Sequence, residues 1–213
     1  MDILPSPAVF AGFTAASALL AITPGPDMAF FLGRTVRGGK RLGFVALSGA
    51  LTGLLFHALL AAFGLSALLA ASASAFQALK IVGCGYLIWL GVHAIRHGSG
   101  IAVANDGATA RGALRVYLSG LAINLFNPKV VMFFLTFLPQ FVSRADPHAS
   151  LKMFILGLDF IATGAVVCTI VIVCAGGFLL AMTGNRRLMR AFDYGIAGLM
   201  GLFAGRLLLS ATR

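Results

Sequence analysis

The chain has 213 residues, of which 60% are hydrophobic and only 10% are charged, and its formal net charge is +10. A soluble domain is typically about 45–50% apolar and about 25% charged, so this composition excludes a water-soluble globular protein and indicates an integral membrane protein. The basic residues stand in short loops between apolar runs, as they do in the cytoplasmic loops of membrane proteins. The positive charge therefore does not indicate nucleic-acid binding.

Six apolar runs are each long enough to cross a bilayer as an α-helix, which takes about 20 residues. The runs are continuous rather than alternating, which predicts helices and not the strands of a membrane barrel. The sequence thus predicts an all-α membrane protein with a single transmembrane domain over residues 1–213. In chain order, the predicted spans cover residues 8–32, 42–70, 76–95, 116–142, 153–182 and 191–209.

The N-terminal residues before the first span lack the basic region of a cleaved signal peptide, so we expect a retained first helix.

The first span is interrupted by a segment that a membrane helix does not tolerate without compensation. A proline in a helix removes a backbone donor and frees a carbonyl of the preceding turn. The freed groups need partners, so the break should face protein or a cavity. The segment consists of Thr23, Pro24, Gly25, Pro26 and Asp27.

The fourth span is interrupted in the same way, by Asn127 and Pro128, which are followed by Lys129. The offset between Pro26 and Pro128 is about half of the chain, and interrupted spans at corresponding positions of two halves indicate a transporter binding site. Each half-helix that begins at such a break has a partially positive N-terminus, which suits a carboxylate. The pattern predicts two inverted three-helix repeats, residues 1–107 and 108–213, with broken first and fourth helices.

Few polar side chains lie inside the apolar runs, and Asp27 and Lys129 are the most informative. A charge at the bilayer centre costs at least about 2.5–3.5 kcal/mol, so each is expected to have a functional partner, although a static ion pair is the alternative. Asp159 in the fifth span is a second acid for proton or amine binding, or a residue near the outer interface. Asn124 is interpreted as an amide that contacts substrate or bridges helices, and His57 as a buried, satisfied histidine.

The loops and cysteines bear on orientation and cofactors. Ten of the sixteen Lys and Arg residues fall in the first, third and fifth loops. The bias places these loops in the cytoplasm and both termini outside. Cys84, Cys168 and Cys174 form no C-x-x-C pair and have no metal-ligand spacing. We therefore expect no metal site and no cofactor, and we interpret the cysteines as small apolar residues.

Several motifs together resemble the lysine exporter (LysE/RhtB) family of bacterial amino-acid exporters. They are the segments 23–27, 124–129 and 133–142, with Gly83 and the segment 86–91 in the third span. The resemblance covers essentially the whole chain. It implies a multi-pass exporter in the bacterial cytoplasmic (inner) membrane that moves amino acids or their derivatives and is driven by the proton gradient. The partners would then be a small-molecule amino acid, protons and the lipid bilayer.

We accordingly predict a secondary transporter with its site at the repeat interface. An exporter of another small solute or a metal ion on the same scaffold is one alternative, and a non-transporting membrane scaffold or membrane enzyme is another. A homo-oligomer is compatible with the sequence, which does not name the amino acid. Protons are predicted to be carried by Asp27 or Asp159. The predicted substrate-binding residues are Thr23, Pro24, Gly25, Pro26, Asp27, Asn124, Asn127, Pro128 and Lys129.

Overall fold

All regular secondary structure in the described part of the computed structural model is helical. The structure describes residues 3–23, 25–65, 73–97, 112–143 and 146–175, together with single positions between 187 and 205. The elements are α1 (Pro7–Ile22), α2 (Pro26–Leu59), η1 (Leu60–Leu65), α4 (Ala73–His97), α5 (Ala113–Leu125), α6 (Pro128–Met132), η2 (Phe133–Phe137), η3 (Leu138–Phe141) and α7 (Ala149–Val173). The all-α prediction is confirmed to this extent.

The predicted break in the first span is present. Helix α1 begins after Ser6, whose hydroxyl accepts a hydrogen bond from the Val9 amide at 3.4 Å, and it ends at Ile22. Helix α2 begins at Pro26, where the missing amide hydrogen costs nothing because the first helical residue has no intrahelical acceptor. Pro24 itself lies outside the described residues.

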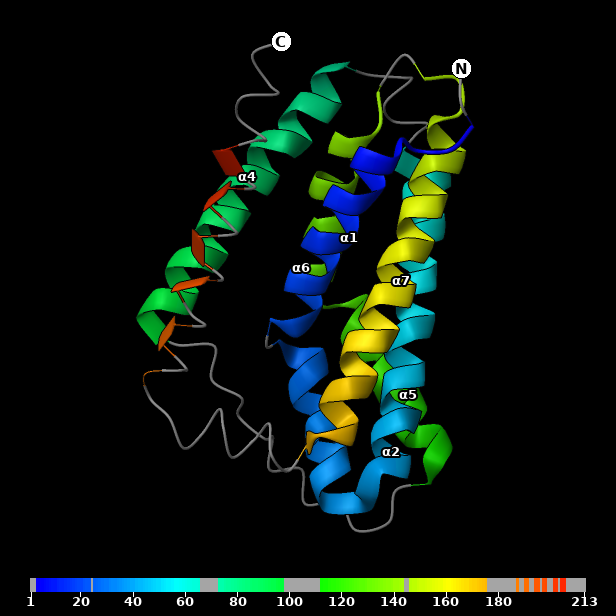
Figure 1. Ribbon diagram of the computed structural model, residues 1–213, viewed down its shortest axis with the longest axis vertical. Coiled ribbons are helices and arrows are strands. Elements are labelled where there is room, and N and C mark those ends of the chain that lie inside the picture. Colours follow the sequence, from blue (N-terminus) through cyan, green and yellow to red (C-terminus); the bar gives the residue numbers. More distant parts are fainter. Residues whose placement is uncertain are drawn as a thin grey trace.

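Helix α2 contains a reversal of the chain at Gly39. This residue has φ 79° and ψ 165°, a conformation that is open to glycine and strained for other residues. Figure 1 shows the first segment of α2 running down from the break and the second running back up beside it. The reversal falls in the basic segment that the sequence predicts to be the first cytoplasmic loop, so α2 supplies the end of the first predicted span and most of the second.

The predicted break in the fourth span is also present. Helix α5 ends at Leu125, and the continuation Pro128–Phe141 is bent from it by 47°. The Asn127 side chain caps α6 by accepting a hydrogen bond from the Lys129 amide at 3.0 Å. The continuation changes from α6 to the π-helix η2 and then to the 3₁₀-helix η3.

Close packing of α2 against α5 brings the two breaks side by side, about half-way along the bundle (Figure 1). A Cβ atom on Gly49 would lie 2.1 Å from the Tyr117 carbonyl oxygen, and one on Gly120 would lie 2.3 Å from the Ala46 carbonyl oxygen. The two backbones therefore touch, as small residues allow in membrane helix pairs. Helix α7 packs across both α1 and α2.

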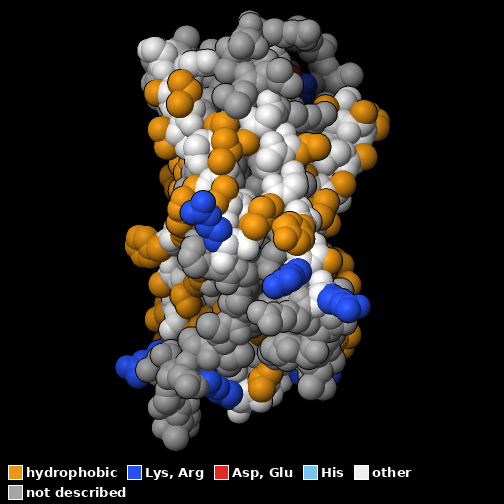
Figure 2. Space-filling view, turned by 90° about the vertical axis from the view of Figure 1, so that its left-hand side faces the viewer, with side chains coloured by type: hydrophobic (Ala, Val, Ile, Leu, Met, Phe, Trp, Pro, Cys, Tyr) orange, Lys and Arg blue, Asp and Glu red, His pale blue; other side chains and the backbone are white. Residues whose placement is uncertain are grey.

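The outer surface of the helices is apolar. Phe63, Val82 and Val166 are 70%, 63% and 61% exposed, and Figure 2 shows hydrophobic side chains spread in patches along the face that it draws. Two stretches in the described residues are long and apolar enough to span a membrane, Pro26–Gly64 and Ala149–Val173, and the bent pair α5 with Pro128–Phe141 would make a third. Because Pro26–Gly64 contains the reversal at Gly39, it forms two shorter legs rather than one straight span.

The remaining predicted spans are described to different extents. Helix α4 covers the third span, and a hydrogen bond from the Cys84 thiol to the Ala204 carbonyl, at 3.7 Å, joins it to the C-terminal part of the chain. The second and fifth spans are helical up to Leu65 and Val173, and their ends lie outside the described residues. The sixth span is described only at single helical positions, so the inverted-repeat topology stays a prediction.

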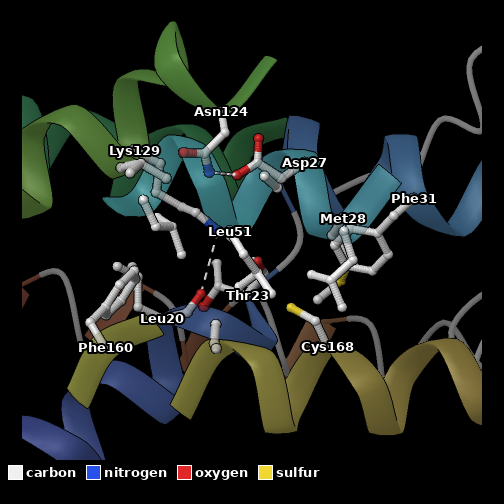
Figure 3. A pocket seen from close by; sticks show the side chains of 16 residues that line it. Leu20, Thr23, Asp27, Met28, Phe31, Leu51, Asn124, Lys129, Phe160 and Cys168 are labelled. Carbon is white, nitrogen blue, oxygen red and sulfur yellow. Dashed lines mark hydrogen bonds between the residues drawn. The ribbon is translucent and has the colours of Figure 1, made fainter. Parts of the chain in front are cut away.

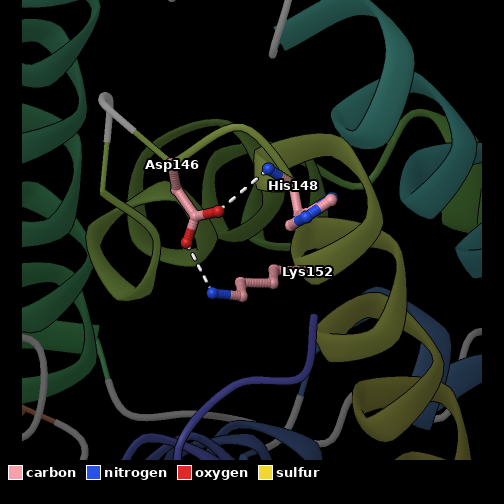
Figure 4. Close-up of polar contacts among 3 residues, drawn as sticks. All are labelled: Asp146, His148 and Lys152. Atoms are coloured by element: carbon pink, nitrogen blue, oxygen red, sulfur yellow. Dashed lines mark hydrogen bonds and ion pairs between the residues drawn. The ribbon is translucent and has the colours of Figure 1, made fainter. Parts of the chain in front are cut away.

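A polar turn leads into α7, as Figure 4 shows. Asp146 accepts a hydrogen bond from the His148 backbone amide at 2.9 Å, and its other carboxylate oxygen pairs with the Lys152 ammonium. The hydrogen bond from Lys152, together with that from His148, holds the pKa of Asp146 below its usual range. This turn lies at the opposite end of the bundle from the reversal at Gly39 (Figure 1).

Candidate functional site

The two helix breaks enclose a cavity, which Figure 3 shows from close by. The space open to the centres of water molecules is about 50 Å³. The cavity lies where two apolar clusters meet, one around Phe13 and Phe133 and one around Phe31 and Ile172. Its lining residues are Leu20, Ala21, Thr23, Asp27, Met28, Phe31, Leu47, Ala50, Leu51, Leu54, Asn124, Lys129, Val130, Phe160, Gly164 and Cys168.

Asn124 joins the second break to the first. Its amide nitrogen donates a hydrogen bond to Asp27 Oδ2 at 2.8 Å, and the Asn124 side chain is 1% exposed. Gly53 makes room for this side chain, because a Cβ atom there would lie 2.5 Å from Asn124 Oδ1. His57 Nε2 lies 3.4 Å from the Asn124 carbonyl oxygen and its ring stacks on Phe134, which bears out the interpretation of His57 as a buried, satisfied histidine.

Lys129 reaches back to the end of α1. Its ammonium donates hydrogen bonds to the carbonyl oxygens of Thr23 at 2.9 Å and Leu20 at 3.4 Å. The last carbonyls of a helix have no intrahelical donor and carry a partial negative charge. A side chain from the second break therefore satisfies backbone groups that the first break exposes.

Asp27 has a complementary position in the first turn of α2. A carboxylate there interacts favourably with the partially positive N-terminus of the helix. Asp27 and Lys129 attract each other through space, while their hydrogen bonds, among the described residues, go to Asn124 and to the α1 carbonyls. The cavity thus holds one acidic and one basic side chain, an arrangement that matches the two charges of a zwitterion.

Three buried polar atoms at the breaks have no hydrogen-bond partner among the described residues. They are Asp27 Oδ1, Asn124 Oδ1 and Asn127 Nδ2. The Asn127 amide lies close enough to the Asp27 carboxylate to stabilise its charge, but Asn127 Nδ2 and Asp27 Oδ1 form no hydrogen bond of good geometry. Because buried polar atoms are usually paired, the unpartnered acceptor Asp27 Oδ1 is a candidate ligand contact, whereas Asn124 Oδ1 packs against Gly53.

The structure brings most of the predicted site residues together. Four of them line the cavity, and Gly25 lies against the Lys129 side chain, where a Cβ atom on the glycine would be 3.1 Å from Nζ. The remaining described residues, Pro26, Asn127 and Pro128, form the helix ends that frame the cavity without lining it. The four lining residues are Thr23, Asp27, Asn124 and Lys129.

Asp159 lies away from these residues. Its Oδ2 accepts a hydrogen bond from the Thr14 hydroxyl at 2.9 Å, between α7 and α1, and the side chain is half-buried. It does not line the cavity, although the next residue, Phe160, does. Asp159 therefore has no direct contact with the Asp27 and Lys129 charges.

Sequence reasoning missed the apolar lining. Phe160, Gly164 and Cys168 recur every four residues and so share one face of α7. That spacing was the available signal, but it is weak in a helix that is apolar on every side. Among the described residues no three His, Cys, Asp or Glu side chains gather as a metal site would require.

Comparison with known proteins places the chain in a family. The model of the LysE type translocator family matches residues 18–211. The homoserine/homoserine lactone efflux protein of Salmonella typhimurium is 31% identical over 196 residues, which are 92% of this chain and 93% of that protein. The leucine efflux protein of Salmonella choleraesuis is 27% identical over 88% of this chain and 89% of that protein.

An uncharacterised membrane protein of Pseudomonas aeruginosa is 31% identical over 86% of each chain. No solved structure matches the chain. The family model covers both helix breaks, and the relatives match over most of the sequence. The chain therefore belongs to the LysE type translocator family, and it is a membrane transporter rather than an enzyme.

Proposed function

We propose that the chain is a secondary transporter that exports an amino acid or a close derivative from the cytoplasm. The names of the relatives, homoserine/homoserine lactone efflux protein and leucine efflux protein, support this substrate class. The observation that carries the proposal is the cavity between the breaks, where Asp27 and Lys129 place an acidic and a basic side chain in a mostly apolar wall. An amino acid presents an ammonium and a carboxylate that fit such a pair.

The size of the cavity supports a small ligand. The centres of water molecules have about 50 Å³ open to them, which is room for more than one water molecule. That space suits the charged head of an amino acid. The side chain of the substrate would then contact the apolar lining from α2 and α7, whose packing sets the preference among amino acids.

We propose that export is coupled to protons through Asp27. Charged groups within membrane spans often serve as proton relays. Asp27 lies beside the substrate space, and one of its oxygens is unpartnered, so proton binding and ammonium binding would exclude each other there. Asp159 is the second candidate, and its place outside the cavity would make it a relay rather than a shared site.

The proposed cycle is the alternating access of two inverted repeats. The basic turn at Gly39 would face the cytoplasm in the inner membrane, as the distribution of Lys and Arg predicts. The cluster of Phe13, Phe133, Phe137 and Phe160 would then close the cavity toward the outside, with Phe133 and Phe160 ring centroids 4.5 Å apart. Opening to the outside would require these rings to separate.

The test is transport by the purified protein in vesicles loaded with one radiolabelled amino acid at a time, with and without a pH gradient. We expect flux of at least one amino acid that falls when the gradient is collapsed. Asp27→Asn cannot exchange a proton, so it should lose gradient-driven flux and keep exchange of substrate across the membrane without a gradient. Asp146→Asn, an equivalent change outside the cavity, is the matched control.

Each of the other outcomes has a clear meaning. Normal gradient-driven flux by Asp27→Asn would rule out Asp27 as the proton carrier, and loss of that flux in Asp159→Asn would assign the role to Asp159. Flux that never responds to the gradient would rule out proton antiport. No flux of any amino acid would refute the proposed substrate class.

A further inference from the structure

The cavity wall between the breaks is rich in hydrogen-bond acceptors. The carbonyl oxygens of Leu20 and Thr23 are taken by the Lys129 ammonium, at 3.4 Å and 2.9 Å. Asp27 Oδ1 and Asn124 Oδ1 have no donor among the described residues, although both are buried. Figure 3 shows Lys129 pointing from its helix across the cavity toward Thr23 and Leu20. The two α1 carbonyl oxygens, together with the Asp27 carboxylate in the same cavity wall, are suited to a cation with several N–H donors.

The position of the Lys129 ammonium is itself a cation site formed by the end of α1. The helix ends at Ile22, so its last carbonyls lack intrahelical donors and face the break. The C-terminal end of a helix dipole adds a partial negative charge. Gly25 leaves this site open, because a Cβ atom there would lie 3.1 Å from Lys129 Nζ. The protein therefore fills a site for a primary ammonium with an ammonium of its own.

We infer that Lys129 is an internal competitor of the substrate. In the substrate-free protein its ammonium occupies the place that the substrate ammonium takes, and substrate binding displaces it. This inference rests on the proposed function, because it assumes an amino-acid substrate in this cavity. The incoming ammonium would bond to the α1 carbonyls and pair with the Asp27 carboxylate. The displaced Lys129 would pair with the substrate carboxylate.

Such displacement makes Lys129 a determinant of specificity. An amine without a carboxylate would displace the Lys129 ammonium from the α1 carbonyls, and it would offer no anion with which Lys129 could pair. An amino acid offsets the cost of displacing Lys129, because its carboxylate forms a charge-assisted contact with the Lys129 ammonium. If Lys129 occupies the site about nine-tenths of the time, the apparent affinity of any amine is reduced about tenfold by this competition.

The test is chemical rescue with amines of matched size. Lys129→Ala removes three methylene groups and the ammonium, which n-propylammonium replaces. Lys129→Met keeps a chain of nearly the same length and lacks only the charged end, which the ammonium ion replaces. The melting temperature of the purified full-length protein is measured in detergent with each chloride salt. Sodium and tetramethylammonium chloride at the same ionic strength have no N–H donor and show the effect of charge alone.

We expect n-propylammonium to raise the melting temperature of Lys129→Ala by about 2 °C or more, with saturation, and ammonium to do the same for Lys129→Met. The wild type and Lys40→Ala, which removes an exposed lysine in the basic turn at Gly39, should not respond. An equal response to tetramethylammonium, or no response of either variant to any amine, would overturn the cation site. If Lys129→Ala does not fold, Lys129→Met with ammonium against tetramethylammonium still decides this point.

A competition measurement then tests whether the substrate shares the site. The amino acid that the wild type transports best should reduce the thermal shift that n-propylammonium gives in Lys129→Ala, and the amine should competitively inhibit transport of that amino acid in this variant only. Simultaneous binding of both would show that Lys129 merely caps α1, and the inference would be wrong. Absence of transport by the wild type would refute the proposed function, while the thermal rescue would still show whether the cation site exists.

Discussion

Gly53 is the residue through which the site can be disturbed without altering any of its polar groups. A Cβ atom at this position would lie 2.5 Å from Asn124 Oδ1, 2.9 Å from its Cβ and 3.0 Å from its Cγ. Asn124 is 1% exposed, so its side chain can turn only toward the cavity that it lines. Gly53→Ala must therefore move Asn124 and break its 2.8 Å hydrogen bond to Asp27 Oδ2.

The magnitude follows from the kind of bond that is lost. A hydrogen bond to a charged group contributes about 1.5–3 kcal/mol. At about 1.4 kcal/mol per factor of ten, its loss from the substrate-binding conformation corresponds to about a 12- to 140-fold lower affinity. We expect Gly53→Ala to weaken the apparent affinity for the transported amino acid by this factor, and Asn124→Ala to do the same.

The assay is the concentration dependence of transport in vesicles, with protein amount and gel-filtration profile checked for each variant. Gly12→Ala is the matched control, because a Cβ atom at Gly12 meets nothing within 4 Å. The double variant Gly53→Ala/Asn124→Ala should be no weaker than Asn124→Ala, since both changes act on one contact. Wild-type affinity in a well-folded Gly53→Ala protein would refute the role of the Asn124–Asp27 contact.

Three further predictions concern the breaks, the packing and the polar turn. Pro26→Ala combined with Pro128→Ala should allow α2 and α6 to extend backward across the breaks. Export should therefore fall severely in the vesicle assay while membrane insertion survives, and normal export would contradict the broken-helix site. Gly120→Ala should lower thermal stability by about 1–3 kcal/mol, because its Cβ atom would lie 2.3 Å from the Ala46 carbonyl oxygen, and an unchanged melting temperature would contradict the close α2–α5 packing. Lys152→Ala should raise the pKa of Asp146 toward its ordinary value in a carboxyl NMR titration, since the folded-state pKa is lowered by its partners. Because the folded-state pKa of Asp146 is lowered, its interactions with Lys152 and His148 stabilise the fold above the unfolded-state pKa, near 3.8. This stabilisation is lost as the pH falls through the folded-state pKa.

The sequence alone determined the membrane character, the helical class and the two helix breaks. These properties are local or compositional: apolar runs need helices in a bilayer, and a proline removes a donor wherever it stands. For the same reason the ends of α1 and α5, at Ile22 and Leu125, fall next to the predicted interruptions. Asp27 and Lys129 were recognisable because charges are costly within apolar runs.

Only the tertiary structure decided which groups these residues meet. Lys129 bonds to the carbonyls of Leu20 and Thr23, more than 100 positions earlier, because α2 and α5 pack backbone to backbone at their glycines. The separation of Asp159 from the cavity, and the lining by Phe160 and Cys168, follow from the rotation of α7 about its own axis. That rotation is set by packing against α1 and α2, and a helix that is apolar on all sides carries no sequence pattern that would reveal it.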